Sequence, residues 1–241
     1  MYNCKNCDKE SIGEFCSNCG VPKEFKRINR QYITDEISSV LNLDKGIFYT
    51  IKELFIRPGN TVKRFIEGDR KRIVKPIIFL IICSLIYTIA QQFFSFEAGY
   101  IKYDIKDRND TPIMVKIFEW FSKNYGYANI LMAVFITFWI KIFFKKSNYN
   151  HYEIYILLCF IMGNSILIYT LLGIIESIID FPILQLGLFI NLIYITWAIG
   201  QFFGKKKKIN YLKGFLSYIF GVITCLIFFF TIGIGLDILL K

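Results

Sequence analysis

The stretch IIFLIICSLIYTIAQQFF, residues 77–94, decides the fold, because it contains no acidic or basic residue. A bilayer core about 30 Å thick is crossed by roughly 20 apolar residues of helix, so this stretch predicts a membrane-spanning helix. Four later stretches share its character, at 128–144, 154–175, 183–203 and 215–236. A soluble protein can bury one such helix but not five in succession. The sequence therefore predicts an all-α polytopic membrane protein whose five-helix transmembrane domain covers 76–241.

The composition of the 241 residues supports this interpretation. Hydrophobic residues make up 54% of the chain, which includes 25 Phe and 15 Tyr. A water-soluble domain has no interior large enough to bury so much apolar surface. Residues 1–30 are polar and lack the apolar core of a signal peptide, so we expect the N-terminus to stay in the cytoplasm.

The distribution of Lys and Arg predicts the orientation of the five helices. Basic residues are frequent before the first span, between the second and third, and between the fourth and fifth, whereas the other two loops are balanced or acidic. Basic loops stay on the cytoplasmic side, which predicts a membrane protein with a cytoplasmic N-terminus and an external C-terminus. The net charge of +10 then reflects topology and attraction to anionic headgroups, and nucleic-acid binding is an unnecessary explanation.

Two C-x-x-C pairs lie close together in the polar N-terminal segment, CKNC at 4–7 and CSNC at 16–19. Four thiolates suit a tetrahedral Zn²⁺ ion, so residues 1–22 are predicted to form a zinc ribbon. Its expected ligands are Cys4, Cys7, Cys16 and Cys19. Because four protein ligands leave no position for water or substrate, the zinc is expected to be structural. A segment with so few apolar residues can hardly fold without a metal.

Other uses of these cysteines fit the sequence less well. Disulfides are disfavoured in a reducing cytoplasm, and a thioredoxin-like motif needs a βαβ unit that the sequence lacks. An iron–sulfur cluster also takes four thiolates, although the knuckle spacing favours zinc. The remaining cysteines, Cys83, Cys159 and Cys225, stand singly in apolar runs and are interpreted as small hydrophobic residues.

A linker is predicted at 23–43 and an amphipathic juxtamembrane segment at 44–75. Apolar residues repeat at helical spacing over 44–56, and Arg57-Pro58-Gly59 predicts a turn before a second short amphipathic run. Two interpretations stay open: the helices lie on the inner leaflet, or their apolar faces pack against the cytoplasmic ends of the spans. In either case four basic side chains are expected at the membrane surface, namely Arg70, Lys71, Arg72 and Lys75.

The juxtamembrane segment resembles a known family. The sequences NLDKG at 42–46, RPG at 57–59 and GDRKR at 68–72, followed by Pro76, are similar to those of the bacterial membrane family called domain of unknown function 3667. Many members have Gly-Lys-Arg where this chain has Gly-Asp-Arg. The resemblance implies a location in the bacterial cytoplasmic (inner) membrane, an N-terminal zinc knuckle, this basic stretch and several spans. It implies no mechanism.

Two amides are predicted to lie within the membrane, where polar residues are costly. Asn164 lies near the middle of the third span and Asn191 near the middle of the fourth, so both reach a similar depth. They are interpreted either as an interhelical hydrogen bond, worth about 0.6 kcal/mol, or as a polar point on a substrate path. No catalytic residue is predicted, since the sequence shows no triad, carboxylate pair or phosphate-binding loop.

Three functions are therefore considered, in decreasing order of support. The first is a non-catalytic scaffold or adaptor whose zinc ribbon binds a cytoplasmic protein partner. The second is a small transporter or channel with a polar site between the third and fourth spans. The third is an enzyme acting on lipid, for which His151 and Glu153 are the candidate residues.

Overall fold

The computed structural model describes residues 2–4, 7, 9–20, 46–70, 72–94, 96, 116–117, 120, 124–179, 181 and 183–239. The chain divides into two compact units, Met1–Asp44 and Lys45–Lys241. The predicted linker at 23–43, Lys71 and most of the loop between the first two spans lie outside the described residues.

The first unit is built on a short antiparallel pair of strands. β1 (Tyr2–Asn3) pairs with β2 (Glu10–Ser11), so that Tyr2 faces Ser11 and Asn3 faces Glu10. A pair of two-residue strands is too small to be stable alone, so another interaction has to hold this unit together.

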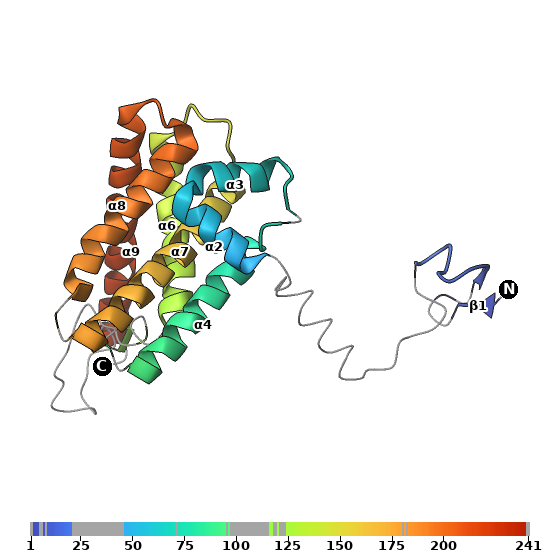
Figure 1. The fold of residues 1–241 in the computed structure, drawn as a ribbon, viewed down its shortest axis with the longest axis horizontal. Coiled ribbons are helices and arrows are strands. Elements are labelled where there is room, and N and C mark those ends of the chain that lie inside the picture. The colour runs from blue at the N-terminus through green and yellow to red at the C-terminus, as the bar shows by residue number, and fades with distance from the viewer. Residues whose placement is uncertain are drawn as a thin grey trace. The chain divides into compact units, whose positions relative to one another are not determined.

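The second unit is a helical bundle preceded by two short helices (Figure 1). The short helices are α2 (Ile47–Ile56) and α3 (Pro58–Glu67), and the bundle consists of α4 (Pro76–Phe94), α6 (Tyr125–Phe143), α7 (His151–Ile179), α8 (Ile183–Gly204) and α9 (Lys208–Leu239). Helix α7 is central, because it packs against α4, α6 and α8 and is buried without interruption over 157–167. Helix α9 completes the bundle against α6 and α8.

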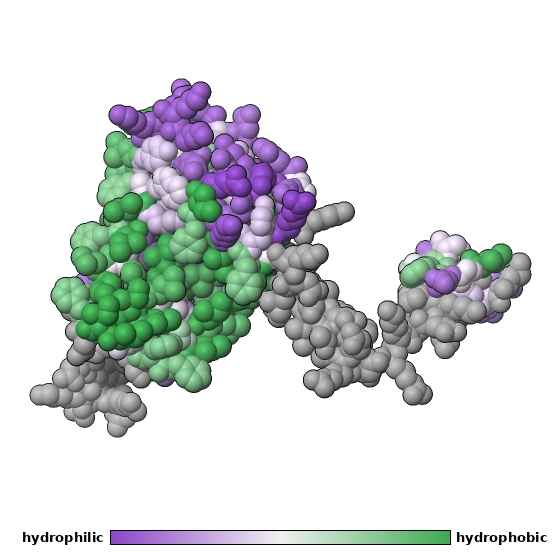
Figure 2. All heavy atoms as spheres, in the orientation of Figure 1, coloured by the Kyte–Doolittle hydropathy of each residue, from purple (hydrophilic) through white to green (hydrophobic). Residues whose placement is uncertain are grey.

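Four of these helices, α4, α7, α8 and α9, are long and apolar enough to cross a membrane, and the described apolar part of α6, Tyr127–Phe143, is somewhat shorter. Each of the five predicted spans therefore corresponds to a helix. Figure 2 shows the hydrophilic residues gathered over α3 and the adjacent end of the bundle, with hydrophobic residues covering the bundle beyond it. This division is typical of a helical protein partly embedded in lipid.

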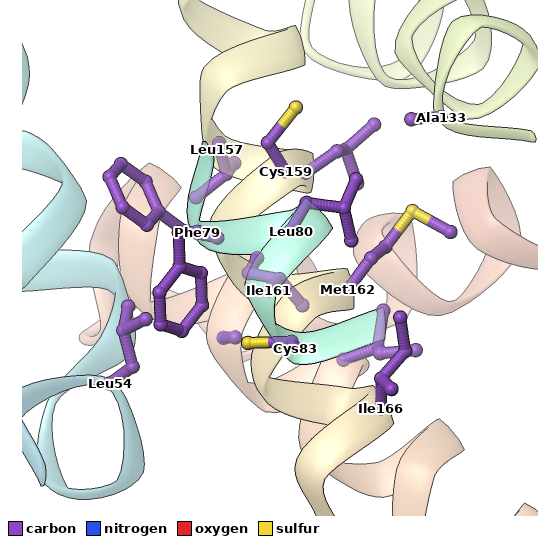
Figure 3. Packing of buried hydrophobic residues seen from close by; sticks show 14 of the residues in the cluster. Leu54, Phe79, Leu80, Cys83, Ala133, Leu157, Cys159, Ile161, Met162 and Ile166 are labelled. Atoms are coloured by element: carbon purple, nitrogen blue, oxygen red, sulfur yellow. The ribbon is translucent and has the colours of Figure 1, made fainter. Parts of the chain in front are cut away.

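The α2–α3 hairpin packs against the bundle through its apolar faces. Leu54 and Val62 are fully buried, and α3 contacts both α7 and α8. Figure 3 shows Leu54 of α2 in the same packing cluster as Phe79 of α4 and Ile161 of α7. These apolar faces therefore pack against the spans, as the second of the two interpretations expected. Phe48, on the other side of α2, is exposed.

Candidate functional site

The four N-terminal cysteines come together in one cluster. All four sulfur atoms lie within 4.8 Å of one another, with 3.5 Å between Cys4 Sγ and Cys19 Sγ and 3.7 Å between Cys7 Sγ and Cys16 Sγ. A tetrahedral ion with metal–sulfur bonds of about 2.3 Å separates its ligands by roughly 3.8 Å. The cluster can therefore bind a metal ion with four thiolate ligands.

Backbone hydrogen bonds shape the two knuckles that carry the cysteines. The Cys4 N–H donates to the Lys9 carbonyl oxygen at 3.0 Å, and the Gly20 N–H donates to the Cys16 carbonyl oxygen at 2.9 Å. Gly20 closes the second knuckle at a φ of 72°, a conformation that glycine adopts without strain. The Lys9 backbone N–H also lowers the pKa of Cys7 below its usual value, which favours the thiolate that binds metals.

A buried carboxylate joins α2 to α3 in the second unit. Glu53, with a side chain only 7% exposed, accepts hydrogen bonds from Arg57 at 2.9 Å and from Arg64 at 2.7 Å. The guanidinium of Arg57 is the main cause that holds the pKa of Glu53 below its ordinary value. Glu53 is therefore ionised and fully engaged within the hairpin.

The positions of Pro58 and Gly59 explain why the chain turns at Arg57-Pro58-Gly59. Pro58 begins α3 at its first turn, where the N–H that proline lacks has no intrahelical partner. The Gly59 N–H donates to Gln201 Oε1 of α8 at 2.7 Å, and a Cβ on Gly59 would lie 2.8 Å from the Phe202 Cα atom. The missing side chain thus lets α3 lie directly on the backbone of α8.

Two hydroxyl groups that sequence reasoning missed fix the rest of the hairpin. Buried Thr50 donates to the Gly46 carbonyl oxygen at 2.5 Å and accepts from the Val74 N–H at 3.1 Å, which ties α2 to the start of α4. Tyr194 of α8 donates to the Leu54 carbonyl oxygen at 3.1 Å. Thr50 and Tyr194 had no signal in the sequence, because their partners are 24 and 140 residues away.

Asn164 and Asn191 each hydrogen-bond across helices, but not with each other. Asn164 Nδ2 donates to the Tyr194 hydroxyl at 2.9 Å, and Ser165 Oγ donates to Asn191 Oδ1 at 2.6 Å. Neighbouring residues of a helix point about 100° apart, so Asn164 faces Tyr194 while Ser165 faces Asn191. The two amides thus belong to different polar contacts.

A cavity of about 210 Å³ lies between α6, α7, α8 and α9. Asn191 and Ser165 line it, whereas Asn164 does not. Its other lining residues are Asn129, Met132, Met162, Ile166, Leu188, Leu192, Ile195, Tyr218 and Ile219.

The remaining candidate residues lie at the surface. Arg72 and Lys75 are exposed, and Arg70 is exposed beside the Phe65 ring, 5.9 Å from its centroid. Glu153, a candidate for lipid chemistry, instead caps α7: it accepts from the Asn150 N–H at 2.8 Å, while the Glu153 N–H donates to Asn150 Oδ1 at 2.9 Å. His151 is exposed at the same helix start.

The hairpin is also the part of the chain that is similar to known proteins. Residues 44–88 match the family described as protein of unknown function (DUF3667). Over this segment the chain is similar to the DUF3667 family. The matched DUF3667 segment contains α2, α3 and the first part of α4, with the Glu53 cluster and the Arg57-Pro58-Gly59 turn. The four clustered cysteines lie outside it, and no curated protein and no solved structure matches the chain.

Proposed function

We propose that this DUF3667 protein is a non-catalytic membrane scaffold or adaptor that carries a structural zinc ion on Cys4, Cys7, Cys16 and Cys19. The observation that carries the proposal is the cysteine cluster, whose sulfur separations of 3.5 and 3.7 Å suit tetrahedral Zn²⁺. Four thiolates close the coordination sphere, so the ion has a folding role and no open position for chemistry.

The hairpin supports a structural role for the family segment. Its buried polar side chains are engaged: Glu53 binds two arginines and Thr50 binds two backbone groups. The backbone N–H of Gly59 donates to Gln201 of the bundle. Groups engaged in this way hold elements together. The family segment is therefore a docking element that fixes α2 and α3 on α7 and α8.

In the proposed topology all five helices cross the bacterial inner membrane, with the N-terminus in the cytoplasm and the C-terminus outside. Arg70, Lys71, Arg72 and Lys75 then contact anionic headgroups of the inner leaflet. The test is fusion of alkaline phosphatase or green fluorescent protein after Lys241. Phosphatase activity without fluorescence is expected, and the reverse result would mean an even number of spans.

Metal analysis of the detergent-purified full chain tests the zinc. About one Zn²⁺ per chain is expected in the wild type and in Cys225→Ser, whose thiol is buried in α9. Cys16→Ser is expected to lose the ion, because three thiolates do not close the site. A wild type without bound zinc, or with iron and sulfide in its place, would remove the structural-zinc proposal.

The adaptor role has its own test. Cys4→Ser is expected to abolish co-purification of a cytoplasmic protein that the wild type and Cys225→Ser both retain, while all three insert equally into membranes. If the same proteins accompany all three, the zinc ribbon is only a structural cap, and the adaptor proposal fails.

The cavity between α6, α7, α8 and α9 favours a second candidate function, that of a small transporter or channel. Asn191 and Ser165 place a polar contact in the lining of this cavity within the bundle, as a solute path through the membrane requires. Proteoliposome uptake of a small neutral solute that Asn191→Leu abolishes would support transport. Equal uptake by the wild type, the variant and empty liposomes would argue against it.

A further inference from the structure

The strongest unassigned feature of the second unit is the partly open cavity between α6, α7, α8 and α9. With a volume of about 210 Å³, it touches all four of these helices. For comparison, an apolar cavity of about 150 Å³ holds a benzene molecule. This cavity is larger by roughly 60 Å³, which is the volume of about two water molecules. The space therefore suits a compact ring or branched chain that carries a small substituent.

The lining of the cavity excludes a charged occupant. None of the described residues around it is acidic or basic, and most are aliphatic or methionine. An ion placed there would lose its hydration without gaining a counter-charge, which costs far more than such a site can return. Met132 and Met162 have flexible, polarisable side chains that adapt to differently shaped apolar groups.

One polar group in the cavity wall is positioned but unused. Asn191 is only 9% exposed, and the Ser165 hydroxyl donates to its Oδ1 atom at 2.6 Å. That bond orients the amide, while Asn191 Nδ2 has no hydrogen-bond partner among the described residues. Because Asn191 lines the cavity, an acceptor atom of an occupant could take a hydrogen bond from its Nδ2 group.

We propose that this cavity binds a small uncharged amphipathic molecule whose hydroxyl or carbonyl oxygen accepts a hydrogen bond from Asn191 Nδ2. The apolar part of the molecule lies against Met132 and Met162. The inference deepens the second candidate function, since it names the class of solute, but it does not require that the solute be transported. If the protein binds such a molecule but does not take it up into proteoliposomes, the binding proposal stands and the transport proposal fails.

The test uses 4-fluorobenzyl alcohol as the probe and the detergent-purified full chain as the receptor. Saturable binding is measured by ¹⁹F relaxation and displaced with benzyl alcohol. Asn191→Leu is expected to bind about tenfold more weakly, which corresponds to one lost hydrogen bond. Thr88→Leu, which removes an exposed hydroxyl of α4 outside the cavity, is expected to bind like the wild type.

Chemical analogues separate recognition from partition into detergent. 4-Fluorotoluene, which lacks the oxygen, and 4-fluorobenzoate, which is charged, are each expected to bind at least tenfold more weakly than the alcohol. If Asn191→Leu does not fold, Met162→Phe, which fills the cavity from α7, is expected to abolish saturable binding. Non-saturable uptake in the wild type, or equal binding of alcohol and toluene, would overturn the proposal.

Discussion

Single atoms of the family segment determine how it meets the bundle. The Gly59 N–H donates to Gln201, and the absence of a side chain at Gly59 leaves room for the backbone of Phe202. The hydroxyl of Thr50 hydrogen-bonds two backbone groups. Glu53 neutralises two arginines in one place. Each of these contacts therefore depends on one group of a single residue.

Gly59→Ala is expected to destabilise the protein by about 1–3 kcal/mol, because the new methyl group would collide with the backbone of Gln201 and Phe202. Backbone cannot rotate away as a side chain can. The measurement is the thermal unfolding midpoint in detergent. Gly235→Ala is the control, since nothing lies within 4 Å of a Cβ at that position and the midpoint should not fall. Equal midpoints for both variants would mean that α3 does not rest on α8.

Glu53→Gln is expected to lower the free energy of unfolding near neutral pH by about 1–2 kcal/mol, since both arginines lose a charged partner but still reach solvent. The folded protein holds the pKa of Glu53 below its ordinary value of 4.5. This contribution is therefore complete above pH 4.5 and is lost as the pH falls through the folded value. Denaturant unfolding from pH 7 down to pH 3 should show the two proteins converging in acid, whereas a constant difference would contradict the ion pair.

At the scale of elements, the hairpin is held by a relay of hydrogen bonds that starts inside the bundle. Asn164 of α7 donates to the Tyr194 hydroxyl of α8, and Tyr194 in turn donates to the Leu54 carbonyl oxygen of α2. Because the Oδ1 atom of Asn164 has no hydrogen-bond partner among the described residues, the only hydrogen bond of this side-chain amide in that part of the chain is with Tyr194. The relay makes the position of α2 sensitive to one hydroxyl group.

Tyr194→Phe is expected to loosen the hairpin, because it leaves the Asn164 amide and the Leu54 carbonyl without partners, a loss of about 1–3 kcal/mol. Amide hydrogens of 47–67 should exchange about tenfold faster, while those of α9 should not change. The matched control is Tyr152→Phe, whose ring is 81% exposed at the start of α7. Equal exchange rates of the 47–67 amides in the wild type and in Tyr194→Phe would show that these hydrogen bonds do not hold the hairpin.

The sequence predicted those elements whose cause is local. Each apolar run became a helix, and the cysteine spacing brought four thiols together, because both depend on residues close in the chain. The sequence did not predict the partners of Tyr194 and Gln201, which lie 140 and 142 residues away. It also suggested that Asn164 and Asn191 meet each other, whereas the rotation of α7 directs them to different neighbours.

At the scale of the whole molecule, the cysteine cluster and the helical bundle belong to separate compact units. The first has two short strands and few apolar residues, while the second has its own extensive hydrophobic core. Their stabilities should therefore depend on different interactions, metal ligation in one and helix packing in the other.

Removal of the metal is accordingly expected to unfold one unit only. After treatment with a chelator, or in Cys16→Ser, proteases should cleave within residues 2–20, which two short strands cannot protect. The melting midpoint of the helices, followed by circular dichroism, should shift by less than about 2 °C, which is under roughly 1 kcal/mol for a unit of this size. A larger shift would show that the two units stabilise each other.

The long separation between Gly59 and Gln201 has a consequence for biosynthesis. The hairpin leaves the ribosome first, and its partner on α8 follows 142 residues later. At about 5–20 residues per second, translation takes roughly 7–28 s to supply that partner. Until then Val62 of α3 has no helix α8 to pack against, and the nearest apolar phase is the membrane surface. The nascent hairpin is thus expected to rest first on lipid and to move onto protein only when the fourth span has been inserted.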